Sequence, residues 1–300
     1  MALDTVGTAL IRRHIGRRLT ALRDKRKLSQ DQVSTAVTLS RSTIVRMEEG
    51  NPAVRYTVPN LKALLDLYEA SEEDREILLA LAAETRNGRS KSWWHDYTNT
   101  ELPEWFGLFV IMEDSATRIR DYQAENIPGL LQTQEYAEVL FQTPAGLATP
   151  EQAKNRLQVR MGRQSILARP KPPRFEVVLN EAILCRPIGG PGLMTRQFEH
   201  LVDMMKRPNV SIRILPWAAG VHGGMYAASS FMLLDFPEDP IGEPIEPPLA
   251  YVDTLTGAMY LNKPSEFAAY ERVWRDIDQK ALSATKSKEL IISVLEGLEE

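Results

Sequence analysis

The chain has 300 residues, which is enough for two domains of the usual size of ~150 residues each. Hydrophobic residues make up 43% and charged residues 25%, and this globular composition excludes a mainly disordered or fibrous chain. The apolar runs are far shorter than the roughly 20 residues of a membrane span, and arginines interrupt the N-terminal segment early. We therefore expect a cytoplasmic protein without a membrane partner.

The cysteine and histidine content argues against a metal or catalytic site. Cys185 is the single cysteine, so an intramolecular disulfide and a cysteine-based zinc cluster are excluded. His14, His95, His200 and His222 are isolated and lack the spacing of metal-binding pairs. The sequence also lacks the hydrolase elbow, the P-loop and the dinucleotide-binding fingerprint. We expect no catalytic residue, no metal and no cofactor, and a protein that is not an enzyme.

Positive charge is concentrated near the N-terminus. Residues 1–92 carry a net charge of +4, whereas residues 93–300 carry −8. Residues 11–47 alone hold ten basic and two acidic side chains. A basic end on an acidic chain is typical of a nucleic-acid-binding surface, although a solvated helical face has the same composition.

The first predicted element is an amphipathic helix over residues 11–26. Ile15, Leu19 and Leu22 recur at i, i+4 and i+7, which places them on one buried face. Arginines occupy the other face of this helix.

Two short capped helices are expected next. Ser29 is a candidate N-cap, and Gln32 three residues later completes a capping box for a helix that buries Val33 and Ala36. Ser40 is the N-cap of the following helix.

The third helix buries Ile44 and Met47 and ends at Gly50, with Pro52 beyond it. Two short helices joined by a tight turn form a helix-turn-helix unit. Two more helices complete an all-α domain of five helices, with apolar residues at Leu61, Leu64, Leu65 and Tyr68 and at Ile77, Leu78, Leu81 and Ala82.

This region resembles the Cro/cI-type helix-turn-helix of XRE regulators over roughly residues 14–70. The resemblance rests on Gln30, Val33, Leu39-Ser40-Arg41-Ser42-Thr43-Ile44, Met47-Glu48 and Gly50. Ser34 stands where the family usually has alanine, and Thr38 where it usually has glycine. Because a β-branched residue disfavours positive φ, we expect a turn wider than the family standard.

The resemblance implies that the third helix enters the major groove of double-stranded DNA. The residues expected to contact bases are Arg41, Ser42, Thr43, Val45 and Arg46. The residues expected to contact phosphates are Gln30, Ser40, Asn51, Arg55 and Arg18.

A linker and aromatic junction is expected over residues 87–105, between a DNA-binding domain at 1–86 and a second domain at 106–300. The linker is polar, and aromatic residues follow it closely: Trp93, Trp94, Tyr97, Trp105 and Phe106. These side chains should pack against the second domain or against a partner.

The second domain is predicted to be α+β, so that the whole chain is α+β. Helices are expected over residues 113–125, 133–141, 150–167, 197–206, 266–282 and 288–298. Strands are expected over 175–179, 210–215, 231–236, 249–253 and 258–261, with a surface loop at 237–248. Arg156, Arg160 and Arg163 should lie on the outer face of their helix and pair with carboxylates.

The second domain resembles the C-terminal region of WhiJ-type actinobacterial regulators. The resemblance rests on Pro128-Gly129-Leu130-Leu131-Gln132-Thr133, Tyr136-Ala137, Arg163-Gln164, Glu181, Arg207-Pro208-Asn209-Val210, Leu215-Pro216 and Gly220, His222 and Gly224. It implies an antitoxin-like transcriptional regulator that binds a small companion protein encoded nearby.

Three functions remain open at this level. The first is a regulator, dimeric on a palindromic operator, whose second domain senses a companion protein or a small molecule. The second is an enzyme with a DNA-targeting domain and a catalytic centre at His222, with Glu181 and Asp253 as acid and base. The third is a scaffold in which residues 288–298 form the dimer seam.

Overall fold

The computed structural model of the chain describes residues 8–51, 53–86, 104–142, 149–227, 230–239, 242–255 and 257–299. The chain forms two compact units. The first comprises Met1–Trp93 with Phe236–Pro247, and the second comprises Trp94–Asp235 with Pro248–Glu300. The expected linker and most of its aromatic residues, together with Pro52, lie outside the described residues.

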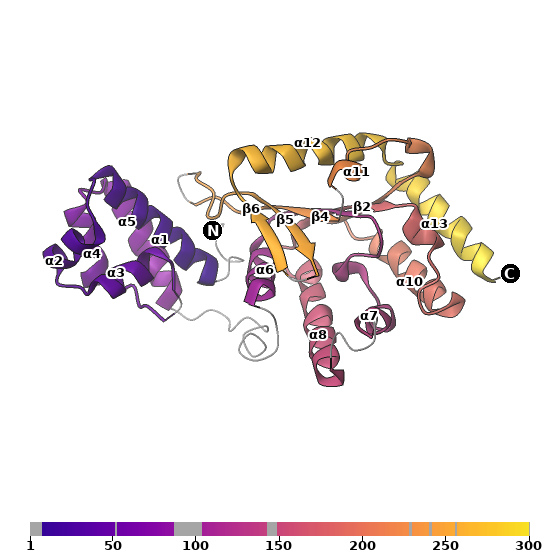
Figure 1. The fold of residues 1–300 in the computed structure, drawn as a ribbon, viewed down its shortest axis with the longest axis horizontal. Helices are drawn as coiled ribbons and strands as arrows, with labels where there is room; N and C mark the ends of the chain where they lie inside the picture. Colours follow the sequence, from indigo (N-terminus) through magenta and orange to yellow (C-terminus); the bar gives the residue numbers. More distant parts are fainter. Residues whose placement is uncertain are drawn as a thin grey trace. The chain divides into compact units, whose positions relative to one another are not determined.

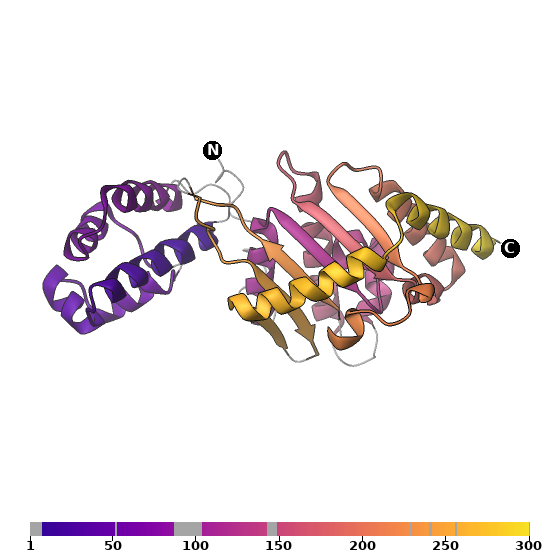
Figure 2. The ribbon, with the colours of Figure 1, turned by 90° about the horizontal axis from the view of Figure 1, so that it is seen from above.

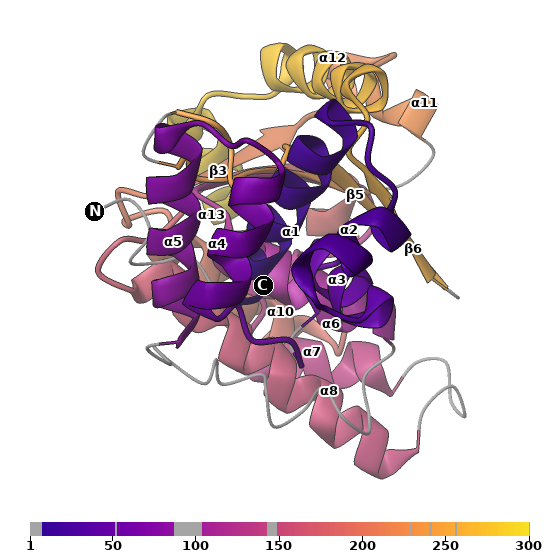
Figure 3. The ribbon, with the colours of Figure 1, turned by 90° about the vertical axis from the view of Figure 1, so that its left-hand side faces the viewer.

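The first unit contains the five expected helices, which face the viewer in Figure 3. They are α1 (Thr8–Lys25), α2 (Gln30–Val37), α3 (Arg41–Glu48), α4 (Val58–Leu67) and α5 (Glu72–Arg86). Their apolar faces meet in one core, which includes the residues predicted from helical spacing, such as Ile15, Ile44 and Leu61. Amphipathic spacing therefore located these helices correctly.

The turn between α2 and α3 differs from the wider turn that Thr38 led us to expect. Ser29 forms the predicted capping box with Gln32, and Ser40 caps α3. Thr38 adopts a left-handed conformation with φ of 57°, so the expectation of a wider turn was wrong. The packing of the two helices imposes this conformation despite its intrinsic cost of about 1 kcal/mol or more. The expected burial of Ala36 was also wrong, because its side chain is exposed.

The second unit is built on a six-stranded mixed sheet with the order β3-β2-β1-β4-β5-β6. Its strands are β1 (Arg118–Gln123), β2 (Arg174–Asn180), β3 (Val210–Leu215), β4 (Phe231–Asp235), β5 (Leu249–Thr254) and β6 (Gly257–Leu261). The strands β1, β2 and β3 are parallel, whereas β4 pairs antiparallel with β1 and starts an antiparallel half. All five predicted strands are present, and the α+β class is confirmed.

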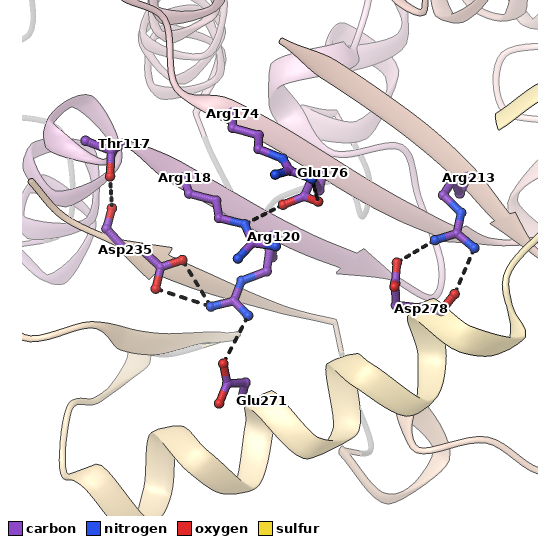
Figure 4. A network of polar contacts seen from close by, with 9 residues as sticks. All are labelled: Thr117, Arg118, Arg120, Arg174, Glu176, Arg213, Asp235, Glu271 and Asp278. Carbon is purple, nitrogen blue, oxygen red and sulfur yellow. Dashed lines mark hydrogen bonds and ion pairs between the residues drawn. The ribbon is translucent and has the colours of Figure 1, made fainter. Parts of the chain in front are cut away.

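The central strand β1 replaces the C-terminal part of a predicted helix. Residues 113–125 do not form one helix, because α6 (Glu104–Ser115) ends and β1 begins at Arg118. The sequence of β1 is Arg-Ile-Arg-Asp-Tyr-Gln, in which charged residues separate the two buried apolar residues, Ile119 and Tyr122. Arg120 is nonetheless buried, and Figure 4 shows it between Asp235 of β4 and Glu271. Pairing with these distant carboxylates offsets the cost of burying the charge of Arg120.

Helices cover both faces of the sheet. The remaining helices are α7 (Gln134–Phe141), α8 (Pro150–Arg163), α9 (Ala182–Cys185), α10 (Pro191–Met204), α11 (Gly224–Ala227), α12 (Pro264–Lys280) and α13 (Ala284–Glu299), with short 3-10 turns at Gly129–Leu131, Gln164–Ala168 and Trp217–Ala219. Figures 1 and 2 show α12 lying across one face, and Figure 1 shows α6, α8 and α10 on the other. The expected outward position of Arg163 was wrong, because its side chain is buried against Glu113.

Candidate nucleic-acid interface

The helix α3 presents a polar face to solvent. Its inner side is fixed by Ile44 and Met47, which are buried in the core. The predicted base-contacting residues follow one outer surface: Arg41, Ser42 and Arg46 are exposed, and Thr43 and Val45 are half-buried. Arg41 lies 3.3 Å from Asp31 and has 62% of its side chain exposed, so it is free to reach another partner. Four of these side chains share one open face with Glu49 and Asn51: Arg41, Ser42, Val45 and Arg46. Thr43 is not part of that face, and its hydroxyl lies 2.8 Å from that of Ser40.

Close contacts with α1 hold α3 in place. A Cβ atom on Gly16 would lie 2.2 Å from the carbonyl oxygen of Glu48, so the crossing of α1 and α3 requires glycine there. Tyr56 donates a hydrogen bond to the carbonyl oxygen of Met47 at 2.6 Å. Arg23 forms an ion pair with Glu48 at 2.6 Å. These contacts fix the orientation of α3 relative to the rest of the unit.

The predicted phosphate-contacting residues at the ends of α2 and α3 differ in their surroundings. Gln30 is half-buried and donates a hydrogen bond to Glu48 at 2.8 Å. The Ser40 hydroxyl accepts the backbone N–H of Thr43 as the cap of α3. Asn51 is half-buried, while Arg55 is exposed. Ser40 and Arg55 are therefore the exposed members of these four.

The arginines of α1 are paired with a segment distant in the sequence. Residues 236–247, hereafter the acidic segment, pack on α1 as part of the first unit. Arg13 and Arg17 both reach Glu246, whose side chain is only 1% exposed. Arg18 pairs with Glu243 and, at 2.5 Å, with Asp74. Arg18 would have to exchange these carboxylates for a phosphate in order to contact DNA.

The buried His14 of α1 also contacts the acidic segment. The Nδ1 atom of His14 lies 3.0 Å from the carbonyl oxygen of Ile245, and its Nε2 atom lies 3.4 Å from Asp239. Burial lowers the pKa of His14, Arg17 lowers it further, and Asp239 opposes both effects. The sequence indicated only a surface loop here; the available signal was four acidic residues without a basic one, together with the apolar Ile245.

Comparison with known families assigns both parts of the chain. Residues 14–78 match the model of a helix-turn-helix domain. Residues 106–293 match the model of DUF5753, a domain of unknown function. The chain belongs to the DUF5753 family. Comparison with the curated proteins and with the solved structures found no match.

The helix-turn-helix domain points to a DNA-binding regulator rather than an enzyme. The helices that the structure describes include none that is both long and apolar enough to cross a bilayer. Within the same residues, no group of three or more His, Cys, Asp and Glu side chains is arranged to hold a metal ion.

The three candidate catalytic residues of the DUF5753 region differ in their surroundings. His222 is buried beside the ring of Tyr122, at 6.2 Å between centroids. Glu181 accepts the backbone N–H of Trp217 at 2.6 Å. Asp253 is exposed on β5. None of the hydrogen bonds and ion pairs between described residues joins His222 to Glu181 or Asp253.

The glycine-rich loop of the DUF5753 region has a packing role. A Cβ atom on Gly224 would lie 2.6 Å from the hydroxyl of Tyr122. The backbone N–H of Gly223 donates to Asp276 of α12 at 2.7 Å. Burial lowers the pKa of His222, whereas Asp276 raises it. Glycine allows this loop to approach the sheet and α12 closely.

Proposed function

We propose that the protein is a sequence-specific transcriptional regulator that inserts α3 into the major groove of double-stranded DNA. The observation that carries the proposal is the exposed face of α3, where Arg41 and Arg46 lie on a helix held by Gly16 and Tyr56. Arginine recognises guanine through two hydrogen bonds, which contribute about 1–3 kcal/mol of discrimination per contact. Ser42, Thr43 and Val45 complete the base-reading set.

Phosphate contacts from Gln30, Ser40, Asn51, Arg55 and Arg18 would orient this helix on the duplex. Regulators of this architecture read palindromic operators as dimers, with half-sites about 34–36 Å apart. We infer the same arrangement here, in the cytoplasm and on the nucleoid.

The test is fluorescence anisotropy of the full-length protein on its own upstream DNA and on a scrambled duplex, over a range of salt concentrations. We expect specific binding that weakens steeply with salt, because cations displaced from phosphates return at high salt. Arg41→Ala combined with Arg46→Ala should weaken specific binding ~100-fold or more. The mass of the specific complex should correspond to two chains per duplex.

Arg26→Ala is the matched control, since Arg26 is an exposed arginine of the same unit that pairs with Glu69 away from α3. It should change specific affinity by no more than ~3-fold. Equal affinity for both duplexes at every salt concentration, or equal losses in the two variants, would contradict sequence reading by α3.

We further infer that the DUF5753 region senses a partner or a ligand. The resemblance to WhiJ-type regulators supports an antitoxin-like role with a small companion protein. Exposed apolar side chains between β3 and β4 support a protein-binding surface: Trp217, Val221, Met225 and Tyr226. Such side chains lose unfavourable contact with water when a partner covers them.

A further inference from the structure

The second unit contains a cavity of about 550 Å³ between the sheet and helices α6 and α8. Sites for small molecules are typically ~300–1,000 Å³ and are lined largely by apolar and aromatic groups. The aromatic side chains of this wall are Phe106, Phe109, Phe141, Phe231 and Tyr251. Polar and charged residues share this wall, among them Gln123, Asn126, Arg160 and Asp253, so the cavity has the size of a ligand site and both aromatic and polar groups in its lining.

The cavity lies at a break in the sheet topology. It is lined by Gln123 at the end of β1 and by Asn126 just beyond. There β1 has the parallel β2 on one side and the antiparallel β4 on the other. In open α/β sheets, ligands bind outside the carboxyl ends of the parallel strands, and Gln123 and Asn126 place the cavity at that end of β1.

Two hydrogen-bond donors of the lining lack acceptors. The Nε atom of Arg160 and the hydroxyl of Tyr251 are buried, and neither has a hydrogen-bond partner among the described residues. Arg163, by contrast, is matched by Glu113 through two hydrogen bonds of 2.6 Å. Unpaired buried donors cost free energy, so a hydrogen-bond acceptor placed beside these two groups would be stabilised.

The guanidinium of Arg160 is held in a fixed position. It donates to Gln132 at 2.7 Å and lies over the ring of Phe141 at 4.7 Å. A Cβ atom on Gly129 would come within 2.7 Å of the Arg160 side chain, so glycine makes room for it. Burial, together with the neighbouring Arg163, lowers the pKa of Arg160 to about 10, and Glu113 and the exposed Asp253 offset only part of this effect.

We propose that this cavity binds a small organic anion with an aromatic body, whose carboxylate accepts hydrogen bonds from Arg160 and Tyr251. The aromatic walls enclose the body of the ligand, and the carboxylate supplies the negative charge that a buried guanidinium favours. Arginine suits this role because its planar donors match a carboxylate.

The cavity is connected through the chain to the segment that pairs with α1. β4 and β5 contribute Phe231 and Tyr251 to the cavity, and the acidic segment is the connection between these two strands. That segment is the part of the chain that pairs with α1 in the first unit. A role for the ligand as effector rests on the DNA-binding function proposed above, whereas binding itself does not.

The test is calorimetric titration of the full-length protein with phenylacetate, cinnamate and naphthaleneacetate, in the absence of DNA. At least one of these carboxylates should bind saturably, and its neutral amide should bind at least ~10-fold more weakly, which corresponds to ~1.4 kcal/mol. Arg160→Gln should weaken the carboxylate at least ~10-fold, and Tyr251→Phe roughly 3- to 10-fold. Tyr251→Phe removes only a hydroxyl, so it separates loss of binding from loss of folding.

Lys154→Gln is the matched control, because Lys154 is an exposed cation of the same helix α8. It should leave carboxylate affinity unchanged. The proposal is overturned if none of the three carboxylates binds at millimolar concentration. It is equally overturned if the amide binds as tightly, or if Arg160→Gln and Lys154→Gln have equal effects.

Anisotropy of the protein–DNA complex, repeated with the bound carboxylate, tests the effector role separately. Release or tightening of DNA that is absent in Tyr251→Phe would support it. Failure of the protein to bind DNA at all would concern the proposed function and leave the calorimetric result intact.

Discussion

The helices α1 and α3 are both rich in arginine, yet they use these residues in different ways. On α1, Arg13 and Arg17 reach Glu246, and Arg18 reaches Glu243 and Asp74. On α3, the side chain of Arg41 is 62% exposed. A high density of basic residues therefore does not by itself locate a DNA-binding surface. The carboxylates that face each arginine control its availability, and on α1 two of them, Glu243 and Glu246, come from a segment more than 200 residues away.

The largest effect on stability and DNA binding should come from a substitution where α1 and α3 cross. Gly16→Ala would place a Cβ atom 2.2 Å from the Glu48 carbonyl oxygen, a backbone atom that cannot rotate away. We expect a loss of ~3 kcal/mol in the free energy of unfolding, measured by denaturant titration, and weaker specific DNA binding. The matched control is Gly192→Ala, where the nearest atom would lie 3.8 Å away. Similar stabilities of the two variants would show that α3 does not depend on this close approach.

A smaller effect should follow from pH, through the buried His14 of α1. Burial lowers its pKa in the folded protein, so the unfolded chain takes up a proton at higher pH than the folded one. The contribution of His14 to the free energy of unfolding should therefore fall as the pH decreases below ~6.5, by about 1 kcal/mol between pH 7.5 and 5.5. Asp121, whose pKa burial raises to about 7, has the opposite effect, so the contribution of His14 is measured as the difference in slope between the unmodified protein and His14→Gln in denaturant titrations at several pH values. Equal slopes in the two proteins would exclude His14 as a titrating group.

The smallest effect should come from neutralising the acidic segment. Glu243→Gln combined with Glu246→Gln frees Arg13 and Arg17 from Glu246 and leaves Arg18 with Asp74 as its carboxylate partner. We expect binding to a scrambled duplex to tighten by roughly 3-fold at low salt, with a steeper salt dependence. Glu238→Gln, at an exposed position of the same segment, is the control. Equal salt slopes in all three proteins would show that these arginines stay unavailable to DNA.

The parts of the fold that were predicted correctly depend on short-range chemistry. The caps at Ser29 and Ser40 act on backbone groups three residues away, and both appear in the structure. The strands β2 and β3 have apolar residues in sequence and were found for the same reason. Local signals of this kind need no knowledge of the rest of the chain.

The central strand β1 could not be predicted in this way. Its residue Asp121 is completely buried, and burial raises its pKa to about 7. A carboxylic acid and an arginine side by side are signs of a surface, unless partners elsewhere compensate them. Arg120 has such partners in Asp235 and Glu271, and Asp121 accepts a hydrogen bond from Gln123.

Local sequence patterns predicted the five helices of the first unit, five of the six strands and the polar face of α3. Capping, spacing and binary pattern suffice for these, because they act over a few residues. Three features are visible only in the tertiary structure. The acidic segment pairs with the arginines of α1, β1 is a central strand, and Arg160 and Tyr251 line one cavity. Each of these features depends on groups far apart along the chain. Their charges and hydrogen-bond donors interact only when folding brings them together.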